Sequence, residues 1–273
     1  MEILLANTPE QIKANIEHAL AGCYRPFSKL MDSESGRVSI VGSGPSLHQN
    51  WREIEGDIIA CNAAGQFLLE RGVVPKYVMI FDADILAEEF VLNPHKDVTY
   101  LLASRCHPKL FEHLQNYKVV LWHAKGDVNL EAILAQHNCM EASRSIIGGG
   151  GAAVTRAMFV AQALGYQTLH LYGTDSSYTG ETHIRKSTTK ERHFRVKFGD
   201  RVFDTTPWLA AQAEDFKLLT PLLQRIGMRV VVHGEGLIPS LAKAMDLDTD
   251  DELKLHQLWR GVRNKSLTLW ANL

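Results

Sequence analysis

The stretch Val38-Ser-Ile-Val-Gly-Ser-Gly-Pro-Ser-Leu47 decides the fold class that we predict for this chain of 273 residues. It opens with a short run typical of a strand buried on both faces and continues into a turn with two glycines. Glycines let the backbone approach a phosphate closely, and we expect free N–H groups and a following helix N-terminus to supply positive potential there. The turn is neither a Rossmann GxGxxG nor a Walker A loop, and a tight turn without a ligand is the alternative. The candidate ligand-binding residues of this turn are Gly42, Ser43, Gly44, Pro45 and Ser46.

Short apolar runs alternate with helical patterns along the rest of the chain. This alternation favours a mostly parallel sheet with right-handed crossovers, so we predict a doubly wound, Rossmann-like α/β fold. The predicted strands are residues 38–41, 57–60, 77–81, 98–102, 119–122, 168–171 and 229–232, and the predicted helices are residues 8–21, 63–71, 108–115, 152–164 and 207–225. Apolar and polar residues alternate around Gly199-Asp200, which predicts a small β-hairpin insertion at about 188–206. The predicted division is an N-terminal helical segment at 1–36, a catalytic domain at 37–247 and a C-terminal helical tail at 248–273.

The composition is that of an ordinary globular protein, with 45% hydrophobic and 22% charged residues. A formal net charge of −2 gives no global field that attracts nucleic acid or an anionic membrane. Four widely spaced cysteines without a CxxC pair argue against a disulfide framework or a zinc site. The N-terminus lacks the basic region of a signal peptide, and no apolar run approaches the ~20 residues of a membrane span. We therefore expect a cytoplasmic enzyme that acts on small molecules, and a homo-oligomer remains open.

Polar side chains follow two of the predicted strands. Asn62 can cap the next helix or hydrogen-bond a base or ribose, and the sequence leaves both roles open. Asp82 and Asp84 form a pair of carboxylates that can hold Mg²⁺ between phosphate oxygens. In the alternative interpretation, Asp84 caps the helix that begins at Ile85, and Asp82 is solvated beside it.

Four consecutive glycines, 148–151, directly precede the predicted helix at 152–164. Glycine costs about 0.5–1 kcal/mol relative to alanine in regular structure, so such a run implies close approach to a ligand, or mobility. Gly149, Gly150 and Gly151 are therefore candidates for a second anion-binding helix N-terminus. Arg156 follows in the first turns, although it can equally face solvent.

The predicted strand at 168–171 leads into a polar loop. Asp175 stands at the strand end, and His183 follows in the loop. A carboxylate and a histidine can supply acid–base chemistry or orient an acceptor, whereas a solvated surface loop is the alternative.

Taken in order, these segments resemble the MptE-like family, named for archaeal hydroxymethylpterin diphosphokinase. Motifs of the same kind occur in Maf-type proteins linked to flagellin glycosylation and in bacterial lipooligosaccharide sialyltransferases, which use CMP-activated sialic acid. The matching features are the glycine turn, the Asn62 strand end, Asp82, the His-Pro pair in 104–108, the glycine run before an alanine-rich helix that ends Ala-Leu-Gly-Tyr, the Leu-Tyr-Gly-Thr-Asp strand end and a Gly-x-Thr-His loop.

The resemblance implies a nucleotide-dependent transferase. Its best-characterised version transfers diphosphate from a nucleoside triphosphate such as ATP to a hydroxymethyl acceptor, with Mg²⁺. In that version Asp82, Asp84 and Asp175 hold the ion, and His183 is the base or an orienting group. The alternatives are a glycosyltransferase that uses a CMP- or UDP-activated sugar, and a non-catalytic nucleotide-binding protein. Residues 188–206 match nothing in the family, so the acceptor stays open.

Overall fold

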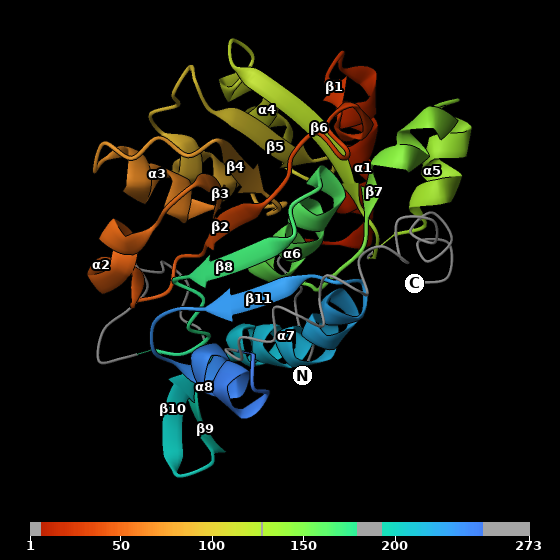
Figure 1. The fold of residues 1–273 in the computed structure, drawn as a ribbon. Coiled ribbons are helices and arrows are strands. Elements are labelled where there is room, and N and C mark those ends of the chain that lie inside the picture. The colour runs from red at the N-terminus through yellow and green to blue at the C-terminus, as the bar shows by residue number, and fades with distance from the viewer. Residues whose placement is uncertain (1–6, 127, 179–192, 248–273) are drawn as a thin grey trace.

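A computed structural model describes residues 7–126, 128–178 and 193–247 (Figure 1). Its centre is a sheet in which every strand pair is parallel. The strand order is β1-β6-β5-β4-β3-β2-β8-β11, and β7 pairs with β6. The strands are β1 (Arg25–Pro26), β2 (Arg37–Val41), β3 (Asp57–Cys61), β4 (Tyr77–Ile80), β5 (Thr99–Ala103), β6 (Lys118–Ala124), β7 (Ile146–Ile147), β8 (Thr168–Tyr172) and β11 (Arg229–Val232). The parallel sheet predicted from the apolar runs is thereby confirmed.

Helices cover both faces of this sheet, which makes the fold doubly wound. The connections from β2 to β6 place α3 and α4 on one face, whereas α6, α7 and α8 pack on the other. The α-helices are α1 (Pro9–Ala21), α2 (Leu47–Asn50), α3 (Ala63–Leu69), α4 (Pro108–His113), α5 (Leu130–Gln136), α6 (Ala153–Leu164), α7 (Pro207–Arg225) and α8 (Leu237–Ala244). Short 3₁₀ helices are η1 (Phe27–Lys29), η2 (Trp51–Glu53), η3 (Ile85–Val91) and η4 (Met140–Ser145).

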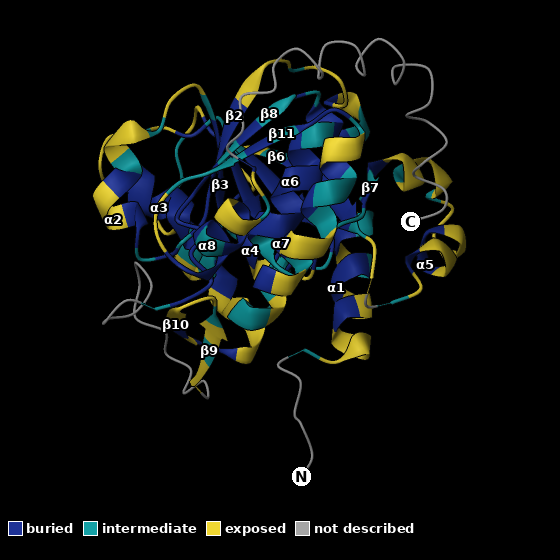
Figure 2. Ribbon diagram, turned by 60° about the horizontal axis from the view of Figure 1, so that its bottom comes forward, coloured by how far each residue is buried: buried dark blue, intermediate teal, exposed yellow. Residues whose placement is uncertain are grey.

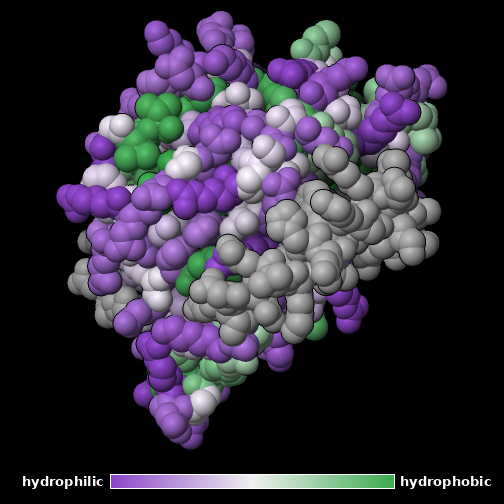
Figure 3. Space-filling view, viewed as in Figure 1, coloured by the Kyte–Doolittle hydropathy of each residue, from purple (hydrophilic) through white to green (hydrophobic). Residues whose placement is uncertain are grey.

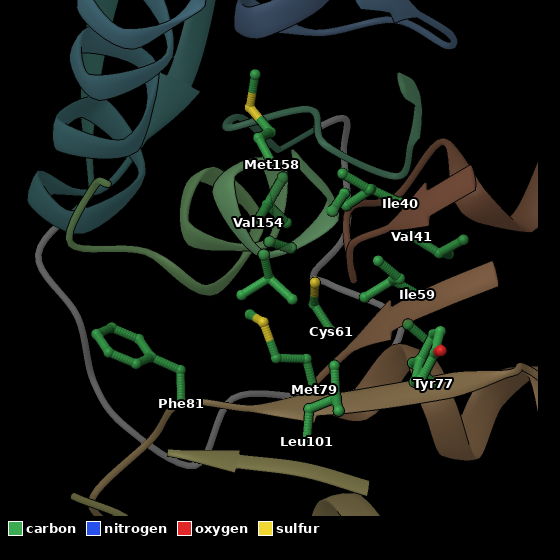
Figure 4. Packing of buried hydrophobic residues seen from close by; sticks show 14 of the residues in the cluster. Ile40, Val41, Ile59, Cys61, Tyr77, Met79, Phe81, Leu101, Val154 and Met158 are labelled. Atoms are coloured by element: carbon green, nitrogen blue, oxygen red, sulfur yellow. The ribbon is translucent and has the colours of Figure 1, made fainter. Parts of the chain in front are cut away.

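The core forms where α6 packs on the central strands. Val154 of this helix points toward Cys61 and Met79, and Met158, Ile40 and Ile59 belong to the same buried cluster (Figure 4). Figure 2 shows these strands and α6 buried, while the outer faces of α2, α5 and α7 are exposed. Burial of apolar surface stabilises the folded state by roughly 25 cal/mol per Å². This contact therefore fixes α6, and with it the glycine run, relative to the sheet.

Local signals set the helix ends as the sequence predicts. The hydroxyl of Thr8 accepts a hydrogen bond of 3.2 Å from the N–H of Gln11 and caps α1. Gly165 ends α6 with a left-handed φ of 109°, which suits a residue without Cβ. α7 begins at Pro207 behind the cap Thr206 and has the bounds that we predicted.

The predicted hairpin is confirmed as β9 (Phe194–Phe198) and β10 (Arg201–Thr205), an antiparallel pair separate from the main sheet. It projects beside α8 and carries mostly hydrophilic side chains on the face in view (Figures 1 and 3). A bridge between Tyr178 and Asp204 joins it to the segment after β8. Among the described residues, no helix combines the length and apolarity that a membrane span requires.

Among the strands and α-helices, β1, β7 and α5 were not predicted, because they are too short or too weakly patterned to stand out in the sequence. The four cysteines Cys23, Cys61, Cys106 and Cys139 are free thiols, as expected. The predicted tail at 248–273 lies outside the described residues.

Candidate active site

The loops after the parallel strands meet at one edge of the sheet, which we call the carboxyl edge. The connections after β2 and β8, which are neighbours in the sheet, lead to opposite faces. Open α/β sheets bind ligands at such a switch point. α6 and α7 both run back toward the start of a parallel strand, so their N-termini also lie at the carboxyl edge.

The glycine turn after β2 packs tightly against the loop after β8. The N–H groups of Gly42 and Gly44 donate to the carbonyls of Tyr172 and Gly173 at 2.8 and 2.7 Å. A Cβ on Gly42 would lie 2.6 Å from the carbonyl oxygen of Gly173, and one on Gly44 would collide with the Asp175 carboxylate. The two glycines are therefore required by packing between loops.

The expected role of this turn needs a correction. The N–H of Ser46 is also engaged, because it donates to Oδ2 of Asp175 at 2.9 Å. Three amides that we expected to be free for a phosphate thus face protein acceptors. The following helix α2, whose N-terminus we expected to add positive potential, has only four residues. These three amides are therefore not available to a phosphate.

Asp175 joins three segments of the chain. Its carboxylate accepts from Ser46, and its carbonyl accepts from Leu237 and Ile238 at 2.8 and 3.2 Å, which caps the start of α8. The residue is 1% exposed, and Oδ1 has no hydrogen-bond partner within the described residues. Burial raises the pKa of Asp175 to about 6, although the Ser46 N–H and the nearby hydroxyl oppose the rise. The Ser46 hydroxyl lies close to this carboxylate without forming a hydrogen bond.

Buried polar atoms without partners recur along the carboxyl edge. The large majority of buried side-chain polar atoms in native proteins have a partner, so these exceptions mark places where a ligand or water can bind. Similar atoms occur elsewhere, for example on α6 and α7, but these do not form a row. Within the described part of the chain, the unpaired atoms at the edge include Ser46 Oγ, Asn62 Oδ1, Ser104 Oγ, His123 Nδ1, Thr174 Oγ1 and Asp175 Oδ1.

Asn62 belongs to this row and has an unusual backbone. It precedes α3 but makes no side-chain capping bond, so the capping alternative is excluded. Its φ of 50° and ψ of −127° place it in a region that non-glycine residues rarely adopt. Such strain costs about 1–3 kcal/mol and concentrates at functional sites. Asn62 therefore stays a candidate ligand-binding residue, with an unpaired Oδ1 and a strained backbone.

Asp82 and Asp84 follow β4 and hydrogen-bond locally. The N–H of Asp84 donates to Oδ1 of Asp82 at 3.0 Å, while Oδ1 of Asp84 accepts from Leu86 and caps η3. Burial raises the pKa of Asp82, and the charge of Asp84 adds to the rise. Capping, the alternative that we considered for Asp84, is what the structure shows.

The two candidate catalytic carboxylates are not brought together. β4 and β8 are separated by β3 and β2, and strands lie about 4.8 Å apart, so the ends of β4 and β8 are about 14 Å apart. Asp82 and Asp175 therefore do not share one ion. Within the described residues, no group of three His, Cys, Asp or Glu side chains is arranged to enclose a metal.

The glycine run carries the chain from β7 to α6. The N–H of Gly151 donates to Oδ2 of Asp215 on α7 at 2.7 Å, and Gly149 has a positive φ of 116°. A carboxylate of the chain itself thus takes the amide that we expected to bind an anion. A cavity of about 400 Å³ lies at the start of the run and is lined by Lys125, Gly126, Val128, Leu130, Glu131, Gly148 and Gly149.

The solvent-facing alternative for Arg156 is wrong, because its side chain is buried at 4% exposure. Its guanidinium donates to the carbonyls of Lys125 and Ile147 at 3.1 and 2.8 Å and lies 5.1 Å from the ring centre of Phe81. Arg105 contacts the same ring at 4.7 Å. Two arginines therefore flank the end of β4, where Asp82 stands. His183 lies outside the described residues.

Comparison with known proteins fits this geometry. A family model described as 6-hydroxymethylpterin diphosphokinase MptE-like matches residues 10–181. The chain belongs to this family. A solved structure titled as a MAf glycosyltransferase from Magnetospirillum magneticum AMB-1 is similar, with 17% identity and a TM-score of 0.58. The similarity covers 94% of this chain and 42% of that one, so the chain spans about two-fifths of that protein's length. None of the curated proteins matches the chain.

Sequence reasoning missed several residues at the carboxyl edge of this MptE-like protein. Ser104 and Arg105 lie in the 104–108 segment that resembles the family but were not chosen as site residues, and Asp215 stands in no recognisable motif. Ser104 ends an apolar run, as Asn62 does, and that shared position was a signal that would have found it. Nothing in the local sequence connects Asp215 on α7 with a glycine 64 residues earlier.

Proposed function

We propose that the protein is a transferase whose nucleotide donor and acceptor bind along the carboxyl edge. In the version that we favour, the reaction is Mg²⁺-dependent transfer of diphosphate from a nucleoside triphosphate to a hydroxymethyl acceptor. The description of the MptE-like family supports this choice. The observation that carries the proposal is the row of unpaired buried polar atoms on Ser46, Asn62, Ser104, Thr174 and Asp175.

Asp175 has the properties of a proton acceptor. Burial holds its pKa near 6, so the group is mostly ionised at neutral pH yet basic enough to take a proton. The carboxylate and the Ser46 hydroxyl beside it are both covered, so the acceptor hydroxyl would have to reach this pair for the proton to pass. The acceptor oxygen then bonds to phosphorus, and the bond to the departing nucleotide breaks.

Asp82 fits the requirements of Mg²⁺. This ion is usually bound by one or two carboxylates together with substrate phosphates, rather than by a protein cage. Burial raises the pKa of Asp82, which means that its negative charge lacks full compensation within the protein. Asp82 would hold the ion, with Asp84 beside it, and the ion would neutralise phosphate charge. Ser104 and Asn62, at the ends of β5 and β3, flank this position and can orient the donor.

Turnover measurements test the proposal. The donors are ATP, GTP and CTP with a hydroxymethylpterin acceptor, and CMP- and UDP-sugars with sugar acceptors, each with Mg²⁺ or excess EDTA. We expect product from a nucleoside triphosphate in Mg²⁺ and none in EDTA. Product from a nucleotide sugar in EDTA would favour the glycosyltransferase instead, and nucleotide binding without any turnover would favour a non-catalytic protein.

Substitution of Asp175 tests its role directly. We expect Asp175→Asn to lower kcat about 10²- to 10⁴-fold, the usual contribution of a general base. Asp204→Asn is the matched control, because Asp204 is an exposed carboxylate on the neighbouring hairpin. Unchanged turnover in Asp175→Asn would remove Asp175 from the mechanism.

A further inference from the structure

Trp208 is an exposed aromatic residue at the start of α7. Its side chain is 70% exposed, although tryptophan is usually largely buried. The backbone beneath it is well defined, since Thr206 caps the helix and Pro207 occupies its first turn. The Thr205 hydroxyl also donates to the carbonyl of Ser176 at 3.0 Å, next to Asp175. A rigid support therefore presents this ring to solvent.

One flank of α7 faces the candidate active site. The side chain of Gln212 donates to the Ser176 hydroxyl at 3.0 Å, and the Asp215 carboxylate accepts from Gly151 at 2.7 Å. These contacts place α7 between the loop after β8 and the glycine run. Trp208 precedes Gln212 by four residues and Asp215 by seven, so all three lie on the same flank.

The position of Trp208 along the helix matters equally. α7 starts at the carboxyl edge, and Trp208 lies one turn, about 6 Å, closer to that end than Gln212. The start of α7, which carries Trp208, therefore lies at the same edge of the sheet as the unpaired polar atoms of Ser46, Thr174 and Asp175.

We infer that Trp208 is a stacking platform for the planar heteroaromatic ring of a substrate bound at the carboxyl edge. The inference rests on the proposed function, because both a nucleotide donor and a pterin-like acceptor carry such a ring. Aromatic side chains offer large, rigid apolar faces that stack on any planar base without hydrogen-bond selectivity. The polar atoms of the edge then hold the phosphates and hydroxyls, while Trp208 holds the ring.

Binding measurements with matched probes test this inference. The variants are Trp208→Ala, Trp208→Phe and Leu218→Ala, a control on the same helix that is 66% exposed and lies ten residues further from the edge. The probes are ATP and a soluble pterin, which contain a ring, and inorganic pyrophosphate, which does not, all with Mg²⁺. Calorimetry gives each Kd.

We expect Trp208→Ala to weaken binding of ATP, of the pterin, or of both by about five- to 150-fold, the range for one stacked base. Trp208→Phe should stay within about threefold of wild type, and pyrophosphate should bind all variants equally. Ligand-induced quenching of tryptophan fluorescence should shrink in Trp208→Phe although binding persists. Since the side chain is exposed, the melting temperature should not change.

Two results would overturn the inference. One is unchanged binding of both ring-bearing probes to Trp208→Ala, and the other is an equal loss of pyrophosphate affinity. Either result leaves the proposed function standing, as long as the wild-type protein converts the substrates and Asp175→Asn shows the expected loss of kcat. If wild-type protein binds none of the probes, the proposed function fails, and the inference fails with it.

Discussion

Asp175 and Asp82 follow parallel strands at the same edge of one sheet, yet their surroundings differ. Asp175 hydrogen-bonds to Ser46, 129 residues earlier in the sequence, and caps α8, about 60 residues later. Asp82 accepts a hydrogen bond from Asp84, only two residues away. Burial raises the pKa of both carboxyls, and the shift is large at Asp175.

The difference separates two kinds of site. Around Asp175, glycines 42 and 44 and the start of α8 leave the carboxylate one fixed position, which suits a group that handles a proton. Around Asp82 there are a local turn and two nearby arginines, which suit a ligand that brings its own charge. We expect the Asp175 end to be sensitive to packing and the Asp82 end to be sensitive to ions.

The largest expected effect comes from adding one methyl group next to Asp175. In Gly44→Ala the new Cβ would collide with the Asp175 carboxylate and lie 2.7 Å from the carbonyl oxygen of Gly173. We expect a loss of roughly 3–5 kcal/mol in unfolding free energy, from the forced shift and from the weakened Ser46–Asp175 hydrogen bond. Urea unfolding measures the loss.

Gly148→Ala is the matched control, because a Cβ there meets nothing within 4 Å. We expect its unfolding free energy to stay within about 1 kcal/mol of wild type. If both variants were equally stable, the tight packing around Asp175 would not distinguish the two regions.

The next effect concerns the cost of keeping Asp175 ionised. Its folded pKa of about 6 lies above the unfolded value, so the folded state holds the proton longer as pH rises. The folded state is therefore penalised progressively between about pH 4 and pH 6, and the full penalty, at most about 3 kcal/mol, persists above pH 6. Asp175→Asn removes this penalty. The unfolding free energy of the variant relative to wild type should therefore rise between about pH 4 and pH 6 and stay constant above pH 6.

Urea unfolding of both proteins at pH 4, 5, 6 and 7.5 checks this expectation. Burial lowers the pKa of His123 to about 4, so this residue makes both proteins less stable as pH falls below about 6.5. That contribution cancels in the difference between them. If the stability difference between the two proteins did not change with pH, burial would not raise the pKa of Asp175.

The smallest expected effect lies at the Asp82 end. We expect Asp82→Asn to raise the Mg²⁺ concentration needed for half-maximal turnover about 10- to 100-fold, because a neutral amide replaces a charged ligand. The melting temperature without Mg²⁺ should not fall, since burial already disfavours the charged carboxylate. A Mg²⁺ titration of turnover compares this variant with Asp84→Asn, whose carboxylate caps η3.

Much of the architecture could be predicted from local patterns. The apolar runs marked seven strands of the main sheet, and the hairpin followed from its alternation around Gly199-Asp200. Membership of the MptE-like family was predicted as well, because its motifs are continuous in the sequence. Asp82 and Asp84 could be predicted as a pair for the same reason, as could the capping alternative for Asp84.

The sequence by itself determined the parallel sheet, the helices between its strands and the residues at the strand ends, because these depend on periodicity and on neighbours along the chain. Only the tertiary structure decided that the amides of the glycine turn face the loop after β8, that Asp215 takes the amide of Gly151, and that Arg156 is buried. Each of these contacts joins segments from different parts of the fold. Hydrogen bonding and burial at such contacts depend on strand order, which no local pattern records.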